Sequence, residues 1–263
     1  MTSKTPIAID PLIERLQNLE GYPVWSLIVT ILGAMSNMGE HKISAHKLSE
    51  VTDRIGVKPD ALRVAVHRLK KDGWIETEKS GRNSTYHLTK FGQTESKSAH
   101  SRIYPWQNPT PPTCVIAILP PIGSGLKTPA EKTLVEQGYH PLAGNLYVGD
   151  FSKSPPEGVF LLDASTASPP AWIIQKLTAP ELITAYDALL EALRALVDFT
   201  KRHHPTDLDG AVLHILALHQ WRRLVLRHPT LPASFSPSDF AQADCVKLLA
   251  PLLGQLPLSS LQD

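Results

Sequence analysis

Apolar residues recur at helical spacing in the first 72 residues, and their pattern predicts four helices. The predicted helices are Pro11–Leu19, Tyr22–Met35, Ser44–Ile55 and Pro59–Asp72. Pro23 and Pro59 suit the first turn of their helices, and Ser44 suits an N-cap. Gly73 follows the last helix directly, where a glycine commonly ends a helix.

After residue 73 the spacing of apolar residues changes from the helical period to an alternation of apolar and polar residues, which is typical of strands. Trp74–Leu88 alternates around Ser80-Gly81-Arg82-Asn83, a sequence with turn chemistry, so two strands joined by a turn are expected. A sharp break at Gly56-Val57 separates the two helices before the hairpin. Three helices followed by a hairpin is the order of a winged helix-turn-helix, which we predict between about Met35 and Gly92.

The rest of the chain predicts a small mixed unit and then helices. The expected elements are a linker over Ser98–Pro112, strands at Thr113–Leu119, Leu146–Val148 and Gly158–Leu162, and helices at Thr128–Gln137, Pro180–His203, Asp209–Arg227 and Pro237–Leu253. We therefore predict an α+β protein with a DNA-binding domain over residues 1–100, an α+β middle domain over 113–170 and a helical domain over 171–263.

Charge and cysteine content add two expectations. Residues 40–102 hold 13 lysines and arginines against 8 aspartates and glutamates, whereas the whole chain has a net charge of only +1. A basic segment in an otherwise acidic chain suits a polyanionic partner, although an ordinary surface can carry such an excess. Two widely separated cysteines and the absence of a signal or membrane segment predict a cytoplasmic protein without a membrane partner.

The Pro59–Asp72 helix separates an apolar face from a basic one at about 100° per residue. The apolar sector contains Ala61, Leu62, Ala65, Val66 and Leu69. The opposite stripe contains Asp60, Val64, His67 and Lys71, and Arg63, Arg68 and Lys70 flank it. Such a face can enter a major groove, where arginine reads guanine and lysine holds phosphate. The alternative is an ordinary solvated face.

The hairpin turn adds polar and basic groups suited to the DNA backbone or the minor groove. The predicted DNA-binding residues are Lys58, Asp60, Arg63, Val64, His67, Arg68, Lys70, Lys71, Lys79, Arg82 and Asn83. One short helix contacts few base pairs, so we expect a homodimer on double-stranded DNA with an inverted-repeat operator.

Four stretches of the chain together resemble the PaaX family of bacterial transcriptional repressors. These stretches are Ala61–Ile75 continuing through Ser80–Gly92, Gly138-Tyr139 with Leu146-Tyr147-Val148, Trp172–Leu189, and Trp221-Arg222-Arg223 with Leu231-Pro232. The resemblance implies a winged helix-turn-helix, a ferredoxin-like (Cas2-like) middle domain and a C-terminal helical domain. The chain departs from the family pattern at His228, where an aspartate is usual, and lacks basic residues after the Val115–Leu119 strand.

The resemblance further implies a ligand-responsive repressor of a catabolic operon, with an acyl-coenzyme A thioester as a candidate effector. Trp221, Arg222 and Arg223 are candidate effector-binding residues, because arginine suits phosphate groups. The alternative is that Trp221 packs in the core while the two arginines pair with acids.

We expect no catalytic residues, no metal site and no cofactor. No serine, histidine and aspartate set has a supporting local motif. The Cas2-like relationship raises a metal-dependent nuclease, but the Val115–Leu119 strand ends without the carboxylate that such a site needs. His214 and His219 lie five residues apart, on different faces of one helix. A protein that is not an enzyme is therefore expected. The alternative is an enzyme or interaction protein that uses the winged helix to bind other proteins.

Overall fold

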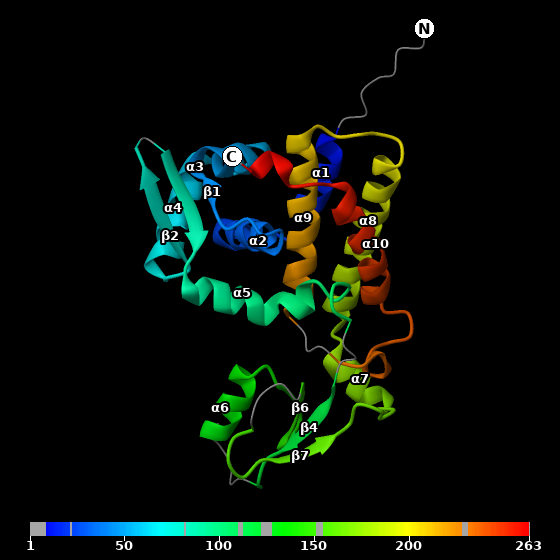
Figure 1. Ribbon diagram of the computed structural model, residues 1–263. Coiled ribbons are helices and arrows are strands. Elements are labelled where there is room, and N and C mark those ends of the chain that lie inside the picture. The colour runs from blue at the N-terminus through cyan, green and yellow to red at the C-terminus, as the bar shows by residue number, and fades with distance from the viewer. Residues whose placement is uncertain are drawn as a thin grey trace. The chain divides into compact units, whose positions relative to one another are not determined.

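A computed structural model describes residues 9–21, 23–81, 83–109, 113–121, 128–150, 155–227 and 231–262. The described residues form ten α-helices and two small antiparallel sheets, which confirms the predicted α+β class (Figure 1). Contacts divide the chain into two compact units, which we describe separately. The first unit combines residues 1–101, 187–223 and 243–263, and the second combines residues 102–186 and 224–242.

The N-terminal part of the first unit combines helices with a small sheet. Its helices are α1 (Asp10–Gln17), α2 (Val24–Asn37), α3 (Ala45–Arg54) and α4 (Pro59–Lys71), followed later by α5 (Lys90–Ile103). Its strands are β1 (Ile43–Ser44), β2 (Ile75–Ser80) and β3 (Asn83–Leu88), in the spatial order β1-β3-β2. Ser44 caps α3 as predicted, because its hydroxyl accepts from the backbone N–H of Lys47 at 3.2 Å.

Two apolar helices form the centre of the first unit. Every residue from Ser26 to Leu32 of α2 is buried, as expected for a helix that is apolar on all sides. Helix α9 (Asp207–Val225) is likewise buried from Gly210 to Trp221. The unit also contains α8 (Pro180–Thr200) from residue 187 onward, most of α10 (Gln242–Gln255) and the short 3₁₀ helix η2 (Ser259–Leu261).

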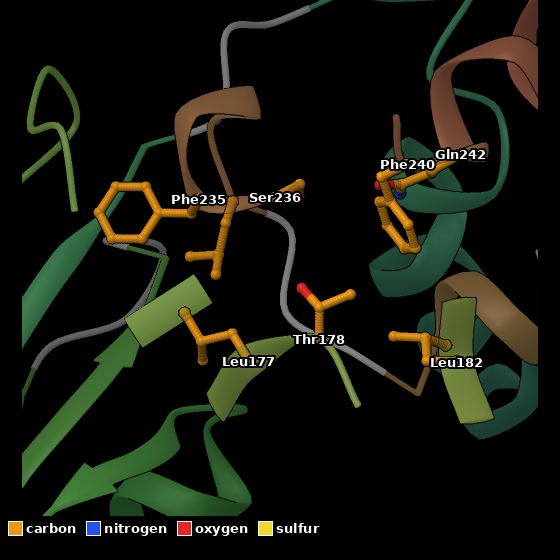
Figure 2. Close-up of a pocket in the computed structure, with 8 residues that line it drawn as sticks. Leu177, Thr178, Leu182, Phe235, Ser236, Phe240 and Gln242 are labelled. Carbon is orange, nitrogen blue, oxygen red and sulfur yellow. The ribbon is translucent and has the colours of Figure 1, made fainter. Parts of the chain in front are cut away.

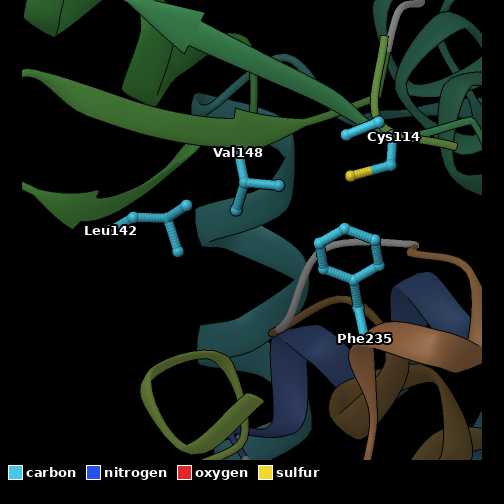
Figure 3. Packing of buried hydrophobic residues seen from close by; sticks show 5 residues of the cluster. Cys114, Leu142, Val148 and Phe235 are labelled. Atoms are coloured by element: carbon cyan, nitrogen blue, oxygen red, sulfur yellow. The ribbon is translucent and has the colours of Figure 1, made fainter. Parts of the chain in front are cut away.

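The second unit is built on a four-stranded antiparallel sheet with the order β5-β6-β4-β7. The strands are β4 (Val115–Ile118), β5 (His140–Ala143), β6 (Leu146–Gly149) and β7 (Phe160–Asp163). Helix α6 (Pro129–Glu136) packs on one face, where Leu134 meets Tyr147. On the other face α7 (Ala171–Leu177) and the 3₁₀ helix η1 (Ala233–Phe235) cover the sheet, and Phe235 packs near Cys114 and Val148 (Figure 3).

A small cavity lies in the second unit where α7 ends and α8 begins (Figure 2). Leu177, Thr178 and Phe240 are among its lining residues. Its volume of about 10 Å³ is close to the minimum that one water molecule needs. This cavity is therefore too small for a ligand.

Several elements differ from the sequence prediction. Ser98–Ile103, predicted as the start of a linker, continues α5. The prediction was wrong because α5 is polar and mostly exposed, and such a helix has no apolar stripe. Strands β1 and β5 and helix α7 were not predicted. Pro141 argues against a strand at the sequence level, because proline cannot donate a backbone hydrogen bond. It is tolerated in β5 because β5 lies at the edge of the sheet.

The expected division into three domains stays a prediction, because contacts alone do not show which segments fold independently. They group α9 and most of α10 with the first 101 residues. Across the described ranges, no helix combines the length and the apolar content needed to span a bilayer.

Candidate nucleic-acid interface

Helix α4 is held by its apolar face, as its sequence predicted. Ala65 and Leu69 are buried, and α4 packs against α2 and α3. The turn from α3 into α4 needs Gly56 with φ +87°, and the N–H of Val57 donates to the carbonyl oxygen of Thr52 at 2.9 Å. The helix ends at Lys71, and Gly73, with φ +73°, follows the C-cap residue Asp72, where a glycine was predicted to stop the helix.

The opposite face of α4 is exposed along its whole length. The exposed residues are Asp60, Arg63, Val64, His67, Arg68, Lys70 and Lys71, and Lys58 precedes them at the N-cap. Val64 is an exposed aliphatic side chain in the middle of this face, with 69% of its surface accessible. The face thus combines cations, hydrogen-bonding groups and one apolar contact.

Two arginines of this face already have partners. Arg63 forms an ion pair with Asp60 one turn earlier, and both side chains are more than three-quarters exposed. Arg68 pairs with Asp72 at 3.5 Å and lies over the ring of Trp25 on α2, 5.5 Å from the ring centroid. Arg68 is therefore drawn toward α2, whereas Arg63 stays on the exposed stripe.

The β2–β3 hairpin presents Lys79 and Asn83 to solvent beside its turn. Arg82 lies outside the described residues. His87 is half-buried and faces Glu76 across the strands, with Nε2 and Oε1 3.1 Å apart. Lys42, just before β1, forms an ion pair with Glu78 on β2. Among the described residues of the hairpin, Lys79 is the exposed cation near the turn, while Lys42 and His87 have acidic neighbours.

Sequence reasoning missed the part that Arg54 plays at the end of α3. Its guanidinium joins Asp10 of α1 at 2.8 Å and Asp209 of α9 at 2.7 Å. Gln17 of α1 also donates to the carbonyl oxygen of Ile55 in the following turn. Residues so far apart in sequence leave no local pattern, so nothing in the sequence pointed to this arrangement.

The three candidate effector-binding residues lie at the junction of α9 with α1 and α2. Trp221 is fully buried. Arg222 donates to the hydroxyl of Ser26 at 3.3 Å. Arg223 donates to the carbonyl oxygen of Gly21 at 2.7 Å and pairs with the carboxylate of Glu20 at 3.3 Å. Trp221 thus packs in the core and Arg223 pairs with an acidic residue, as in the alternative to an effector-binding role.

Two histidines of α9, His214 and His219, are buried and have partners in the core. His219 faces the hydroxyl of Thr30 at 2.7 Å, and burial beside Arg222 and Arg223 lowers its pKa to about 3. Burial likewise lowers the pKa of His214 to about 4. Within the described ranges, no three histidine, cysteine or acidic residues gather closely enough to hold a metal ion.

Comparisons with known proteins point to one family. The family described as PaaX-like protein matches residues 24–92, and the PaaX-like protein C-terminal domain matches residues 178–260. The transcriptional repressor PaaX of Escherichia coli K12 is 24% identical over 253 residues, which cover 89% of this chain and 80% of that protein. An uncharacterized protein from Mycobacterium tuberculosis aligns with a TM-score of 0.42 and 17% identity, over 81% of this chain and 87% of its own. Because the two family matches cover more than half of the sequence and agree with the full-length relative, this chain belongs to the PaaX family.

Proposed function

We propose that the protein is a transcriptional regulator that reads duplex DNA with α4. The order α2, β1, α3, α4, β2, β3, with β1 paired to β3, supports a winged helix-turn-helix. The name of the E. coli relative, a transcriptional repressor, supports the same function. In this arrangement α4 is the recognition helix and the β2–β3 hairpin is the wing.

The exposed face of α4 is the observation that carries the proposal. A major groove about 12 Å wide admits one α-helix, and the stripe formed by Arg63, Val64 and His67 would face the base edges. Val64, which is exposed in the free protein, can contact a thymine methyl group. Lys70 and Lys71, in the last turn, suit the phosphates at the rim.

The Asp60–Arg63 ion pair does not prevent this role. A pair so exposed to solvent contributes at most about 1 kcal/mol, so Arg63 can exchange Asp60 for a base or a phosphate. Asp60 then opposes non-specific contact with the DNA backbone. The pair thus favours base-specific binding over general attraction to DNA.

The second unit would serve assembly and regulation. Its strand order β5-β6-β4-β7 is that of a ferredoxin-like sheet, which supports the predicted middle domain. We propose a homodimer that presents two copies of α4 to an inverted repeat, because paired half-sites provide discrimination that one helix lacks. The protein would repress a catabolic operon, and a small effector would control this repression. An acyl-coenzyme A thioester is the candidate effector.

The test is DNA binding measured by fluorescence anisotropy at several salt concentrations. Arg63→Ala should weaken binding to a selected sequence by about tenfold or more and relax base preference. Lys79→Ala should weaken binding to all sequences alike and reduce the salt slope by about one. Arg15→Ala, an exposed arginine on α1, is the charge-matched control and should change neither. Absence of duplex binding at low salt would contradict the proposal and favour a protein-binding role for the winged helix.

A further inference from the structure

A second cavity lies in the first unit between α1 and the end of α8. Its volume is about 330 Å³, which is within the range of small-molecule sites. Pro11 and Leu12, in the first turn of α1, form one wall. Ala195 and Phe199 of α8 form the opposite apolar wall.

The rim of this cavity carries charge at one side. Arg202 and His203 lie just after the end of α8, and the His203 ring lies 5.1 Å from that of Phe199 at an angle of 32°. Asp198 also lines the cavity, but Lys201 offsets its charge at 3.7 Å. Among the described residues, Arg202 has no ion-pair partner. An apolar hollow with one available guanidinium favours a ligand that has an apolar body and one anionic group.

We propose that this cavity binds a small organic acid, with an aryl or alkyl body between Leu12 and Phe199 and a carboxylate at Arg202. A planar aromatic body can also stack on the Phe199–His203 pair.

The same helix α1 holds the turn between α3 and α4. Asp10, next to the cavity residue Pro11, pairs with Arg54 at 2.8 Å, and Arg54 also pairs with Asp209 on α9. At the other end of α1, Gln17 donates to the carbonyl oxygen of Ile55. A ligand that joins α1 to α8 therefore stabilises the helix that fixes this turn.

Ligand binding should make local opening of the α3–α4 turn rarer, because a ligand stabilises the elements that it contacts. If α4 reads DNA as proposed above, the ligand also stabilises the arrangement that presents α4. The ligand should then raise duplex affinity, and this part of the inference rests on the proposed function.

Calorimetric titration of the full-length protein tests the site without DNA. The probes are 2-naphthoate and its neutral counterpart 2-naphthamide, which differ in charge and hardly in shape. We expect naphthoate to bind about tenfold more tightly or better, and Arg202→Gln to remove this preference. Arg15→Gln, the same charge change on α1 outside the cavity, should keep it.

A cavity-filling variant separates this site from any other. Ala195→Trp should abolish naphthoate binding, whereas Ala243→Trp, on an exposed position of α10, should not. Binding that survives Ala195→Trp, equal binding of both probes, or no binding at millimolar concentration would overturn the site.

Hydrogen exchange at residues 55–57 tests the connection to the turn. Saturating naphthoate should slow exchange there by about threefold or more, and the double variant Asp10→Asn/Gln17→Leu should bind naphthoate but lose this response. An unchanged exchange rate in the parent protein would overturn the connection. Slowed exchange without a gain in duplex affinity would keep the site and overturn its role in DNA binding, whereas loss of all duplex binding would contradict the proposed function itself.

Discussion

Two buried histidines in α9 make the first unit sensitive to acid. His214 faces the carbonyl oxygen of Leu256 at 2.6 Å, and His219 faces the hydroxyl of Thr30 at 2.7 Å. Burial lowers the pKa of His214 to about 4 and, with help from Arg222 and Arg223, that of His219 to about 3. Both histidines are therefore neutral in the folded protein, whereas they titrate near pH 6.5 in the unfolded chain.

The size of the effect follows from these pKa values. Below pH 6.5 the two histidines bind protons in the unfolded chain but stay neutral in the folded chain. The free energy of unfolding therefore falls as the pH falls. Each pH unit between 6.5 and the folded pKa costs about 1.4 kcal/mol per histidine. At pH 5 the loss is about 2 kcal/mol for each residue, a large part of the about 5–15 kcal/mol that stabilises a typical protein.

Urea unfolding followed by circular dichroism at pH 7.5, 6.5, 5.5 and 5.0 measures this loss. His219→Gln should cost about 1–3 kcal/mol at pH 7.5, because the Thr30 contact is disturbed, but should remove about half of the pH dependence. His46→Gln, at an exposed position of α3, is the control and should leave the pH dependence unchanged. An equal pH dependence in His219→Gln and the parent protein would refute the reasoning.

Three further predictions concern α4, two glycines and the cysteines. Asp60→Asn removes the acidic partner from the exposed face of α4 and should raise affinity for all duplexes alike, measured by anisotropy at fixed salt. Gly92→Ala should destabilise the protein by about 1–3 kcal/mol in urea unfolding, because its Cβ would overlap a backbone carbonyl oxygen; Gly33→Ala, in open space on α2, should stabilise it by about 0.5–1 kcal/mol. Burial raises the thiol pKa of Cys114 to about 11 and of Cys245 to about 12, so both should react with a thiol reagent only after urea unfolds the chain.

Local patterns predicted the elements between α2 and β3 well. The 3.6-residue period placed Ala65 and Leu69 of α4 in the core and left Arg63 and His67 exposed. The N-cap at Ser44 was also readable, because capping depends on neighbouring residues alone. These features need no knowledge of distant contacts.

The features that sequence reasoning missed depend on distant contacts or on weak local signals. The Arg54 pairs join segments that no periodicity connects. Arg222 contacts Ser26 and Arg223 contacts Glu20 and Gly21, which are also distant in sequence; the effector-binding role of the two arginines stays a prediction. The end of α5, Ser98–Ile103, was predicted as part of a linker, because exposure on most sides removes the apolar stripe that identifies a helix.

The most direct test of the central claim is enrichment of bound duplexes from a random DNA library. The parent protein should select two inverted half-sites about one helical turn apart. His67→Ala and Val64→Ala should alter the preferred bases within each half-site, because both residues lie on the exposed face of α4. Failure to enrich any sequence, or the same preferences in both variants as in the parent protein, would contradict the claim that α4 reads DNA.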